Sequence, residues 1–419
     1  MSKNNATIQN GWQKSTIGEI SNMNLHSIGL DFVHSEIEYI DISSVGVGNL
    51  LGTTNYEIKE APCRAKRLVS EGDTILSTVR PNRRSFLYIK NPAKNTVVST
   101  GFVVLSPKKE TDSKFLYYII SDPRFADYLS ANTKGSAYPA VSSEVINNAE
   151  ILVPEYKIQK LISSILSSFD DKIENNNRII TTLETMAQGI FKEWFVKFRF
   201  LGYEKARFVD SEMGKIPEGW EVKKVSDMAI LNRGLSYSSP EINDEGKGLP
   251  MINLANFQRG GGFNYSGIKH YTGKYKKTNI VKPGDIVIAM TDLTHNREVI
   301  GHPARVPTYD NQKNILISLD VCSMTIDDIY TEFLYYMMLN KSFSYLMASS
   351  ASGTNVSHLS KSSIENYSFT LPSKDVLQKF KQTIQPIFTQ SHILESENKG
   401  LIKMRDLLLP KLMNGKIKI

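Results

Sequence analysis

The apolar positions between residues 155 and 198 predict one long helix. They recur at alternating steps of three and four for more than five heptads, which is the period of a coiled coil. An unbroken helix of this length spans about 66 Å at 1.5 Å per residue. The seam consists of Ile158, Ile162, Ile165, Phe169, Ile173, Ile180, Leu183, Ala187, Ile190, Trp194 and Phe198, with Asn176 filling its one polar position.

A second seam of the same kind runs through residues 372–419. Its apolar members are Phe380, Ile384, Ile387, Leu394, Leu401, Leu408 and Leu412. Pro386 and Pro410 are expected to kink or end this helix locally, because proline removes a backbone donor. A long amphipathic helix needs a partner for its apolar face. We therefore expect an antiparallel pair within the chain; the alternatives are packing on separate domains or dimerisation between chains.

The chain repeats itself at an offset of 218 residues. The sequence Phe-Leu-Tyr-Tyr at 115–118 recurs at 333–336, and ten residues are identical over forty ungapped positions from there. Upstream, the Gly-Asp pair at 72–73 matches the pair at 284–285, and Gly-Trp at 11–12 matches 219–220. Two copies are too few for a solenoid, which needs at least three. The pattern indicates a pseudo-dimer within one chain.

Short β-type runs, punctuated by glycine and proline, fill the first part of each copy. They include residues 38–42, 96–98, 102–105 and 315–319, and a helix is expected over 114–131. The predicted class is α+β, with two pseudo-repeated mixed α/β domains separated by two long antiparallel, coiled-coil-like helices. The expected parts are a first domain (1–153), a central helix and linker (154–209), a second domain (210–371) and a C-terminal helix (372–419).

Composition and charge narrow the class of protein. Of 419 residues, 41% are apolar and 22% charged, as in ordinary globular proteins. No apolar run approaches 18 residues, the N-terminus lacks the apolar stretch of a secretory signal, and there are only two cysteines. We expect a cytoplasmic protein without a membrane partner or a thiolate-rich metal site. The net charge of +7 favours a polyanionic partner such as nucleic acid.

Motifs of the usual active sites are missing from the sequence. There is no P-loop, no dinucleotide fingerprint, no nucleophile elbow and no Asn-Pro-Pro-aromatic sequence of an amino-methyltransferase. The seven histidines lack metal-ligand spacing, and Asp170 with Asp171 is interpreted as a solvated helix face. We therefore expect no catalytic residue and no metal site, and the chain is interpreted as a binding and organising protein.

Polar segments at matching places in the two copies are candidates for DNA contact. Arginine can pair with guanine or phosphate, and asparagine with adenine. The candidates after the Gly-Asp strands are Arg80, Asn82, Arg83 and Arg84 in the first copy and Thr291, Thr294, Asn296 and Arg297 in the second. The alternative is that these segments are merely polar hairpin loops.

A second pair of segments follows the predicted helices. Small and hydroxyl residues beside Gly135 and Gly353 let the backbone approach a groove closely, although the glycines could simply end those helices. The candidates are Lys134, Ser136 and Tyr138, and Thr354, Asn355 and His358; Lys274 and Lys276 form a further basic stretch, or a solvated surface. Because the copies keep their framework residues but differ in these loops, they resemble two readers of different half-sites.

Four longer motifs resemble the specificity subunits of type I restriction-modification enzymes. They are Leu-Glu-Thr-Met-Ala-Gln-Gly-Ile-Phe-Lys-Glu-Trp-Phe at 183–195, Met-Arg-Asp-Leu-Leu-Leu-Pro-Lys-Leu-Met-Asn-Gly at 404–415, Ile-Pro-Glu-Gly-Trp at 216–220, and Gly-Thr with Ser-His-Leu-Ser within 353–360. The resemblance covers essentially the whole chain. The first copy departs from the last motif, with Ala-Tyr-Pro-Ala at 137–140.

This resemblance implies a noncatalytic subunit that reads an asymmetric, two-part sequence in double-stranded DNA. Two modification subunits, with S-adenosylmethionine for adenine N6 methylation, and restriction subunits, with ATP and Mg, are implied as partners, and no cofactor in this chain. The helix residues implied for docking are Phe169, Ile173, Leu183, Met186, Phe191, Trp194, Phe195, Leu401, Met404, Leu408 and Leu412. The alternatives are a two-headed protein- or carbohydrate-binding adaptor and a self-contained DNA methyltransferase.

Overall fold

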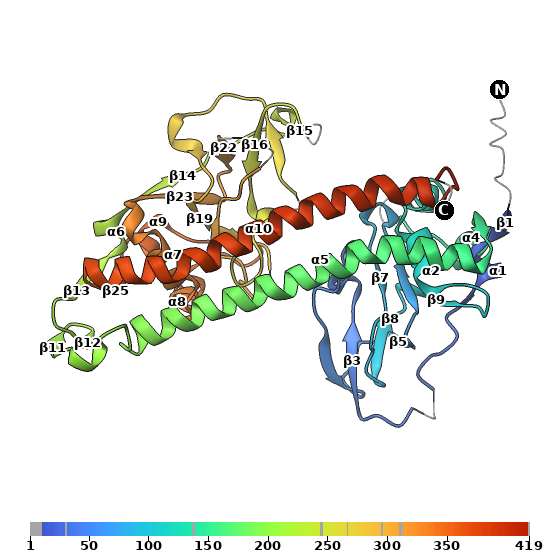
Figure 1. The fold of residues 1–419 in the computed structure, drawn as a ribbon, viewed down its shortest axis with the longest axis horizontal. Coiled ribbons are helices and arrows are strands. Elements are labelled where there is room, and N and C mark those ends of the chain that lie inside the picture. Colours follow the sequence, from blue (N-terminus) through green and yellow to red (C-terminus); the bar gives the residue numbers. More distant parts are fainter. Residues whose placement is uncertain are drawn as a thin grey trace. The chain divides into compact units, whose positions relative to one another are not determined.

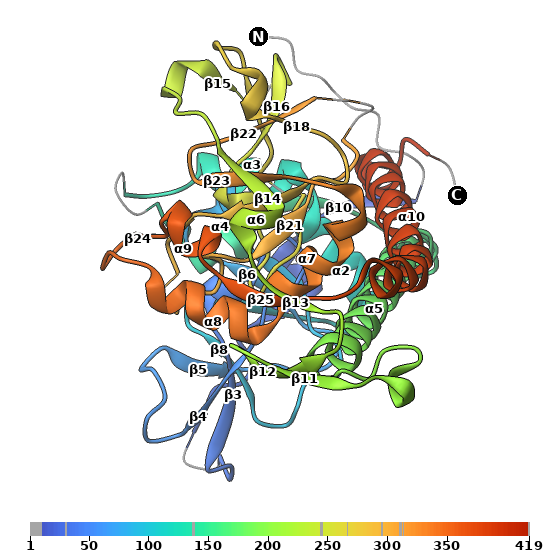
Figure 2. The ribbon, with the colours of Figure 1, turned by 90° about the vertical axis from the view of Figure 1, so that its left-hand side faces the viewer.

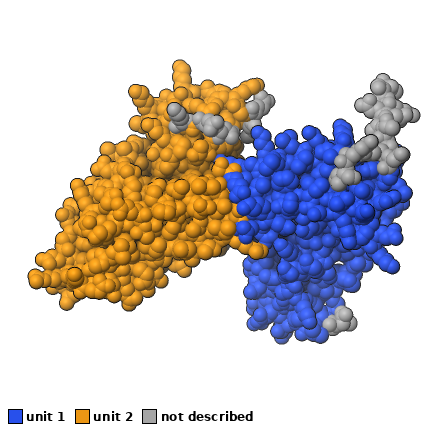
Figure 3. Space-filling view, viewed as in Figure 1, with its two compact units in different colours: residues 1–175, 397–419 blue, residues 176–396 orange. Residues whose placement is uncertain are grey.

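The computed structural model describes residues 11–29, 32–135, 139–243, 246–265, 267–294, 296–309, 312 and 314–417. The chain forms two compact units (Figure 3). Unit 1 consists of residues 1–175 and 397–419, and unit 2 of residues 176–396. Each unit contains one mixed α/β domain together with a part of two long helices, α5 (Tyr156–Phe191) and α10 (Lys374–Leu412) (Figure 1). The predicted α+β class is confirmed.

The domain of unit 1 is built on two four-stranded sheets and one antiparallel strand pair. The sheet orders are β2-β9-β6-β7 and β4-β3-β8-β5, and β1 pairs with β10. All neighbours are antiparallel except β3 and β8. The bounds are β1 Trp12–Thr16, β2 Ser21–Met23, β3 Glu36–Ile40, β4 Thr54–Glu57, β5 Ala65–Leu68, β6 Thr74–Ser77, β7 Phe86–Tyr88, β8 Thr96–Ser99, β9 Phe102–Pro107 and β10 Glu150–Pro154, with α1 Ile17–Ile20, α2 Ser113–Ser121, α3 Pro123–Ala131 and α4 Ser143–Asn147.

The domain of unit 2 repeats this plan with longer connections. Its larger sheets have the orders β14-β23-β19-β21 and β15-β17-β16-β22-β18, and β11-β12, β13-β25 and β20-β24 are separate pairs. The bounds are β11 Phe208–Ser211, β12 Gly214–Pro217, β13 Glu221–Lys224, β14 Ala229–Arg233, β15 Ile242–Asn243, β16 Leu249–Ile252, β17 Lys269–Tyr271, β18 Ile280–Val281, β19 Ile286–Ala289, β20 Thr291–Asp292, β21 Pro303–Arg305, β22 Ile315–Ile317, β23 Val321–Ile326, β24 Ser357–His358 and β25 Ser368–Leu371, with α6 Val225–Met228, α7 Thr331–Leu339, α8 Lys341–Ser350 and α9 Lys361–Glu365.

The repeated Phe-Leu-Tyr-Tyr motif lies in the core of both domains. In α2, Phe115 and Leu116 are fully buried, and in α7 the matching Phe333 and Leu334 are buried in the same way. The single helix predicted over 114–131 is wrong, because Asp122 separates α2 from α3. Asp122 is extended, and its side chain caps α3, whose first residue is Pro123. Proline disfavours a helical conformation in the residue before it, so the first helix ends there.

The two long helices run antiparallel in each unit. In unit 1, the Arg405 guanidinium of α10 binds Asp170 of α5 at 2.7 Å, and Lys172 lies 3.5 Å from Glu397. In unit 2, Phe380 packs on Phe191 of α5 with ring centroids 6.1 Å apart. Early residues of α5 thus meet late residues of α10, and later residues of α5 meet earlier ones. The predicted intramolecular antiparallel pair is confirmed.

The structure changes two expectations about these helices. Pro386 and Pro410 do not end the second helix, since α10 continues through both. A proline inside a helix costs about 3 kcal/mol, and the buried Ile384 and Leu409 beside these positions supply packing that offsets it. Asp170 is not simply a solvated residue, because its carboxylate also accepts a 2.6 Å hydrogen bond from the Tyr118 hydroxyl. None of the described helices is long and apolar enough to cross a membrane.

Candidate nucleic-acid interface

The structure brings the two candidate segments of unit 1 together. The Arg80 backbone N–H donates to the carbonyl of Pro139 at 2.8 Å, and the Val141 N–H donates to the carbonyl of Thr78 at 2.9 Å. Val79 forms a β-bridge with Ala140 between these bonds. Residues 78–84 and 134–141 are called the first loop pair. The candidates Ser136 and Tyr138 lie outside the described residues, and Lys134 is exposed.

Two arginines of the first loop pair have left-handed backbone conformations. Arg80 and Arg84, with φ of 49° and 54°, flank a short 3-10 turn at Pro81–Arg83. The Arg84 guanidinium donates to the carbonyl of Ser121 at 2.8 Å, which ties the loop to the end of α2. Arg84 therefore acts on its own fold, whereas Asn82 and Arg83 are exposed and Arg80 is half-buried.

Unit 2 contains a second loop pair, residues 290–297 and 352–359. Its centre is the antiparallel pairing of β20 and β24, with Thr291 opposite His358 and Asp292 opposite Ser357. The Leu359 N–H donates to the carbonyl of Met290, as Val141 does to Thr78 in the first copy. β24 precedes α9 at the rim of the domain (Figure 2). By this register Asp292 occupies the place of Arg80.

Asp292, which was not among the candidates expected from the sequence, organises the second loop pair. Its carboxylate is almost completely buried and accepts backbone hydrogen bonds from Thr294 at 2.6 Å, Val299 at 2.6 Å and Ile300 at 2.8 Å. Burial acts to raise the pKa of Asp292, but hydrogen bonding by the Thr294 side chain and by these backbone groups outweighs it and lowers the pKa below its usual value. The signal in the sequence was Asp-Leu-Thr at 292–294, since aspartate commonly bonds the backbone two residues on.

Arg297 joins the two segments of the second loop pair. Its Nε donates to Ser357 Oγ at 3.1 Å, and its Nη1 donates to the carbonyl of Ala348 at 2.6 Å. Thr291 is also turned inward, and its hydroxyl donates to Asp320 at 3.0 Å. Thr294 is half-buried, and its Oγ1 accepts from the Glu298 N–H. The candidates exposed to solvent are Asn296, Thr354, Asn355 and His358.

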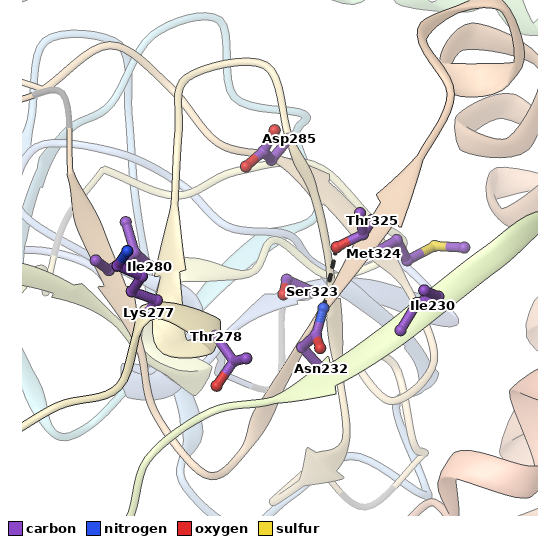
Figure 4. Close-up of a pocket in the computed structure, with 9 residues that line it drawn as sticks. All are labelled: Ile230, Asn232, Lys277, Thr278, Ile280, Asp285, Ser323, Met324 and Thr325. Atoms are coloured by element: carbon purple, nitrogen blue, oxygen red, sulfur yellow. Dashed lines mark hydrogen bonds between the residues drawn. The ribbon is translucent and has the colours of Figure 1, made fainter.

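The remaining basic candidates belong to another part of unit 2. Lys274 and Lys276 are exposed and follow β17, outside the second loop pair. Nearby, a hollow of about 340 Å³ is lined by side chains that include Thr278, Asp285 and Thr325 (Figure 4). Burial raises the pKa of Asp285, although a hydrogen bond from the Lys282 backbone opposes this. No cluster of potential metal ligands occurs within the described ranges.

The helix residues implied for docking fall into three groups by exposure. Phe191, Trp194 and Phe195 are buried in the core of unit 2, where the Phe195 ring lies 4.8 Å from that of Phe380. Leu412 is likewise buried in the core of unit 1. Met186 and Met404, by contrast, are about half exposed. The half-buried members are Phe169, Ile173, Leu183, Leu401 and Leu408.

Comparison with known proteins agrees with this repeated architecture. The profile of the type I restriction modification DNA specificity domain matches residues 9–185 and again 217–403. The MjaIX specificity subunit of Methanocaldococcus jannaschii is 30% identical, over 91% of this chain and 84% of its own. The HindI specificity subunit of Haemophilus influenzae is 24% identical, over 97% and 99%.

A solved structure has a similar fold. It is the S subunit of a type I restriction-modification system from M. genitalium, with a TM-score of 0.52 and 15% sequence identity over 98% of each chain. The sequence profile matches both copies of the repeat, and together these matches cover well over half of the residues. The chain therefore belongs to the family of type I restriction-modification DNA specificity proteins.

Proposed function

We propose that this protein is the noncatalytic specificity subunit of a type I restriction-modification complex and reads an asymmetric, two-part sequence in double-stranded DNA. The observation that carries this proposal is one loop pair built twice on a repeated scaffold, with different exposed side chains in each copy. The first presents Asn82 and Arg83, and the second presents Asn296 and Asn355. Arginine suits guanine and asparagine suits adenine, so two half-sites of different sequence follow.

The chemistry belongs to partner subunits in this proposal. Two modification subunits dock on α5 and α10, where Met186 and Met404 present exposed apolar surface that adapts readily to a partner. Restriction subunits complete the complex. S-adenosylmethionine, ATP and Mg are bound by these partners, and the complex acts on DNA in the cytoplasm.

The direct test is to co-express the chain with its modification subunits, map methylated adenines in the host genome, and measure duplex binding over a salt series. We expect one bipartite motif and a slope of log affinity against log salt of about −0.9 for each phosphate contacted. A protein- or carbohydrate-binding adaptor would give neither result. A self-contained methyltransferase would bind S-adenosylmethionine as the isolated chain.

A domain exchange tests the assignment of one half-site to each domain. Replacing residues 210–371 with the equivalent domain of a relative should change one half of the methylated motif and leave the other half unchanged. The matched control is the exchange of residues 1–153, which should change only the other half. Alteration of both halves by either exchange would contradict the proposal.

A further inference from the structure

Two apolar side chains are exposed in the second loop pair. Leu293 is 68% exposed and Val356 is 36% exposed. Leu293 directly follows Asp292 and Val356 directly precedes Ser357, and Asp292 and Ser357 lie opposite each other in the antiparallel β20–β24 register. The neighbouring exposed residues in these segments are polar. The loop pair thus presents an apolar tip with polar flanks.

This exposure is imposed by internal bonds of the loop pair. The buried carboxylate of Asp292 holds the backbone N–H groups of Thr294, Val299 and Ile300. Arg297 bonds to Ser357 in the second segment and to the carbonyl of Ala348 near the end of α8. The backbone on either side of Leu293 is therefore fixed. A well-bonded loop holds this apolar side chain in water. Binding of a partner that covers the side chain therefore lowers the free energy of the system.

The exposed leucine of the apolar tip has no exposed counterpart at the matching described position of the first copy. By the register of the two loop pairs, Asp292 stands in the place of Arg80, so Leu293 stands in the place of Pro81. Pro81 is buried, whereas Leu293 is exposed. The exposed leucine is therefore not a requirement of the repeated scaffold. It belongs to the part of the chain in which the two copies differ.

Double-stranded DNA is the occupant that fits this tip. The major groove admits a two-stranded β-ribbon, and the C5-methyl of thymine is the apolar group on its base edges. Exposed amide and hydroxyl groups of Asn296, Thr354 and Asn355 flank the tip and suit the polar base edges beside such a methyl group. The tip is also continuous with the segments proposed above to face DNA.

We infer that Leu293 and Val356 are specificity-determining residues that contact thymine methyl groups in the half-site read by the second domain. The inference rests on the proposed function, because it presumes that this loop pair faces DNA. It names the chemical feature that the second domain recognises. A thymine recognised in this way is distinguished from uracil, which keeps every hydrogen-bonding group and lacks only the methyl.

The test uses the complex with modification subunits and a duplex carrying the motif found by methylation mapping. Each thymine of the second half-site is replaced in turn by uracil, and affinity is measured by competition. One or two replacements should weaken binding by the wild-type complex about three- to fivefold, the value of one buried methyl group. In the Leu293→Ala, Val356→Ala variant the same duplexes should bind alike.

The matched control is Ile230→Ala. Ile230 is an apolar side chain with a similar exposure, 66%, but it lies away from the loop pair. It pairs with Thr325 near one end of β23, whereas Ala289, which leads into the loop pair, pairs with Val321 at the other end. This control should keep the wild-type response to uracil. Absence of any uracil effect in the wild type, or an unchanged effect in the double variant, would overturn the inference.

Two further outcomes separate this inference from the proposed function. If the wild-type complex does not prefer its motif over unrelated duplex, the proposed function itself fails. If the double variant instead loses modification subunits while its response to uracil persists, the apolar tip contacts protein, and the inference is overturned while the proposed function stands.

Discussion

Replacement of Asp292 by asparagine should loosen the second loop pair without unfolding the domain. One carboxylate oxygen accepts from Thr294 N and the other from both Val299 N and Ile300 N. The amide of asparagine keeps one acceptor oxygen and puts an NH₂ donor in the place of the other. At best the two bonds to Val299 and Ile300 survive, and Thr294 N then faces a donor.

The magnitude follows from this loss. A hydrogen bond to a charged group contributes about 1.5–3 kcal/mol, and a buried donor left unpaired costs about 1–3 kcal/mol. Both figures describe the loss of the same interaction, so they are not added. We therefore expect Asp292→Asn to lower the free energy of local opening by about 2–3 kcal/mol. Since 1.36 kcal/mol is a factor of ten, amide exchange in residues 293–300 should accelerate roughly 30- to 150-fold.

The assay is hydrogen–deuterium exchange of the full chain in complex with modification subunits, together with binding to the mapped motif. Recognition of the second half-site should weaken while that of the first is retained. Asp285→Asn is the matched control, because Asp285 accepts one backbone bond, from Lys282, which asparagine can keep. Unchanged exchange in residues 293–300 of Asp292→Asn would refute the role given to this carboxylate.

The same variant has a defined pH dependence. Since the pKa of Asp292 is lower in the folded protein than in the unfolded chain, its ionised form stabilises the fold. The stability difference between wild type and Asp292→Asn should be complete above the unfolded pKa of about 3.9 and should shrink as the pH falls through the lower, folded pKa. Denaturant titrations at a series of pH values measure this difference.

Two further predictions concern the first loop pair and the helix–domain junction. Arg83→Ala should reduce the salt slope of DNA binding by about one if Arg83 contacts phosphate, or cost about 1–3 kcal/mol of binding free energy at one position of the motif if Arg83 reads a base; DNA binding unaffected by this change would exclude Arg83 from the interface. Arg84→Ala should instead alter amide hydrogen exchange near Ser121, whose carbonyl the Arg84 guanidinium binds. Phe380→Ala should lower the free energy of unfolding of unit 2 by about 3–5 kcal/mol, because this fully buried ring packs on Phe191, Trp194 and Phe195; a change below 1 kcal/mol in denaturant unfolding would contradict that packing.

The sequence by itself determined the repeat, the fold class and the two long helices. Each of these depends on the period of apolar residues along a continuous segment, which local geometry translates directly into a buried face. Phe115 and Phe333 were recognisable as framework for this reason, and both are buried. The helix boundary at Asp122 was missed, although the following proline was the local signal for it.

Only some of the candidate site residues expected from the sequence are exposed in the structure, and the reason is physical. Composition identified segments rich in hydrogen-bonding residues, but an arginine pattern does not say whether a guanidinium faces solvent or a carbonyl of its own chain. Arg84 and Arg297 bind their own backbone, while Arg83 is exposed. That distinction depends on carbonyl groups of Ser121 and Ala348, which are 37 and 51 residues distant in sequence.

Only the tertiary structure decided which segments meet. The β20–β24 pairing joins Thr291 to His358, and no local periodicity marks two-residue strands so far apart. The same pairing buries Asp292 and leaves Leu293 exposed, which reverses what their side chains prefer in isolation. Backbone donors that must be satisfied in a buried loop outweigh the hydrophobicity of one leucine, and those donors are assembled only when the chain has folded.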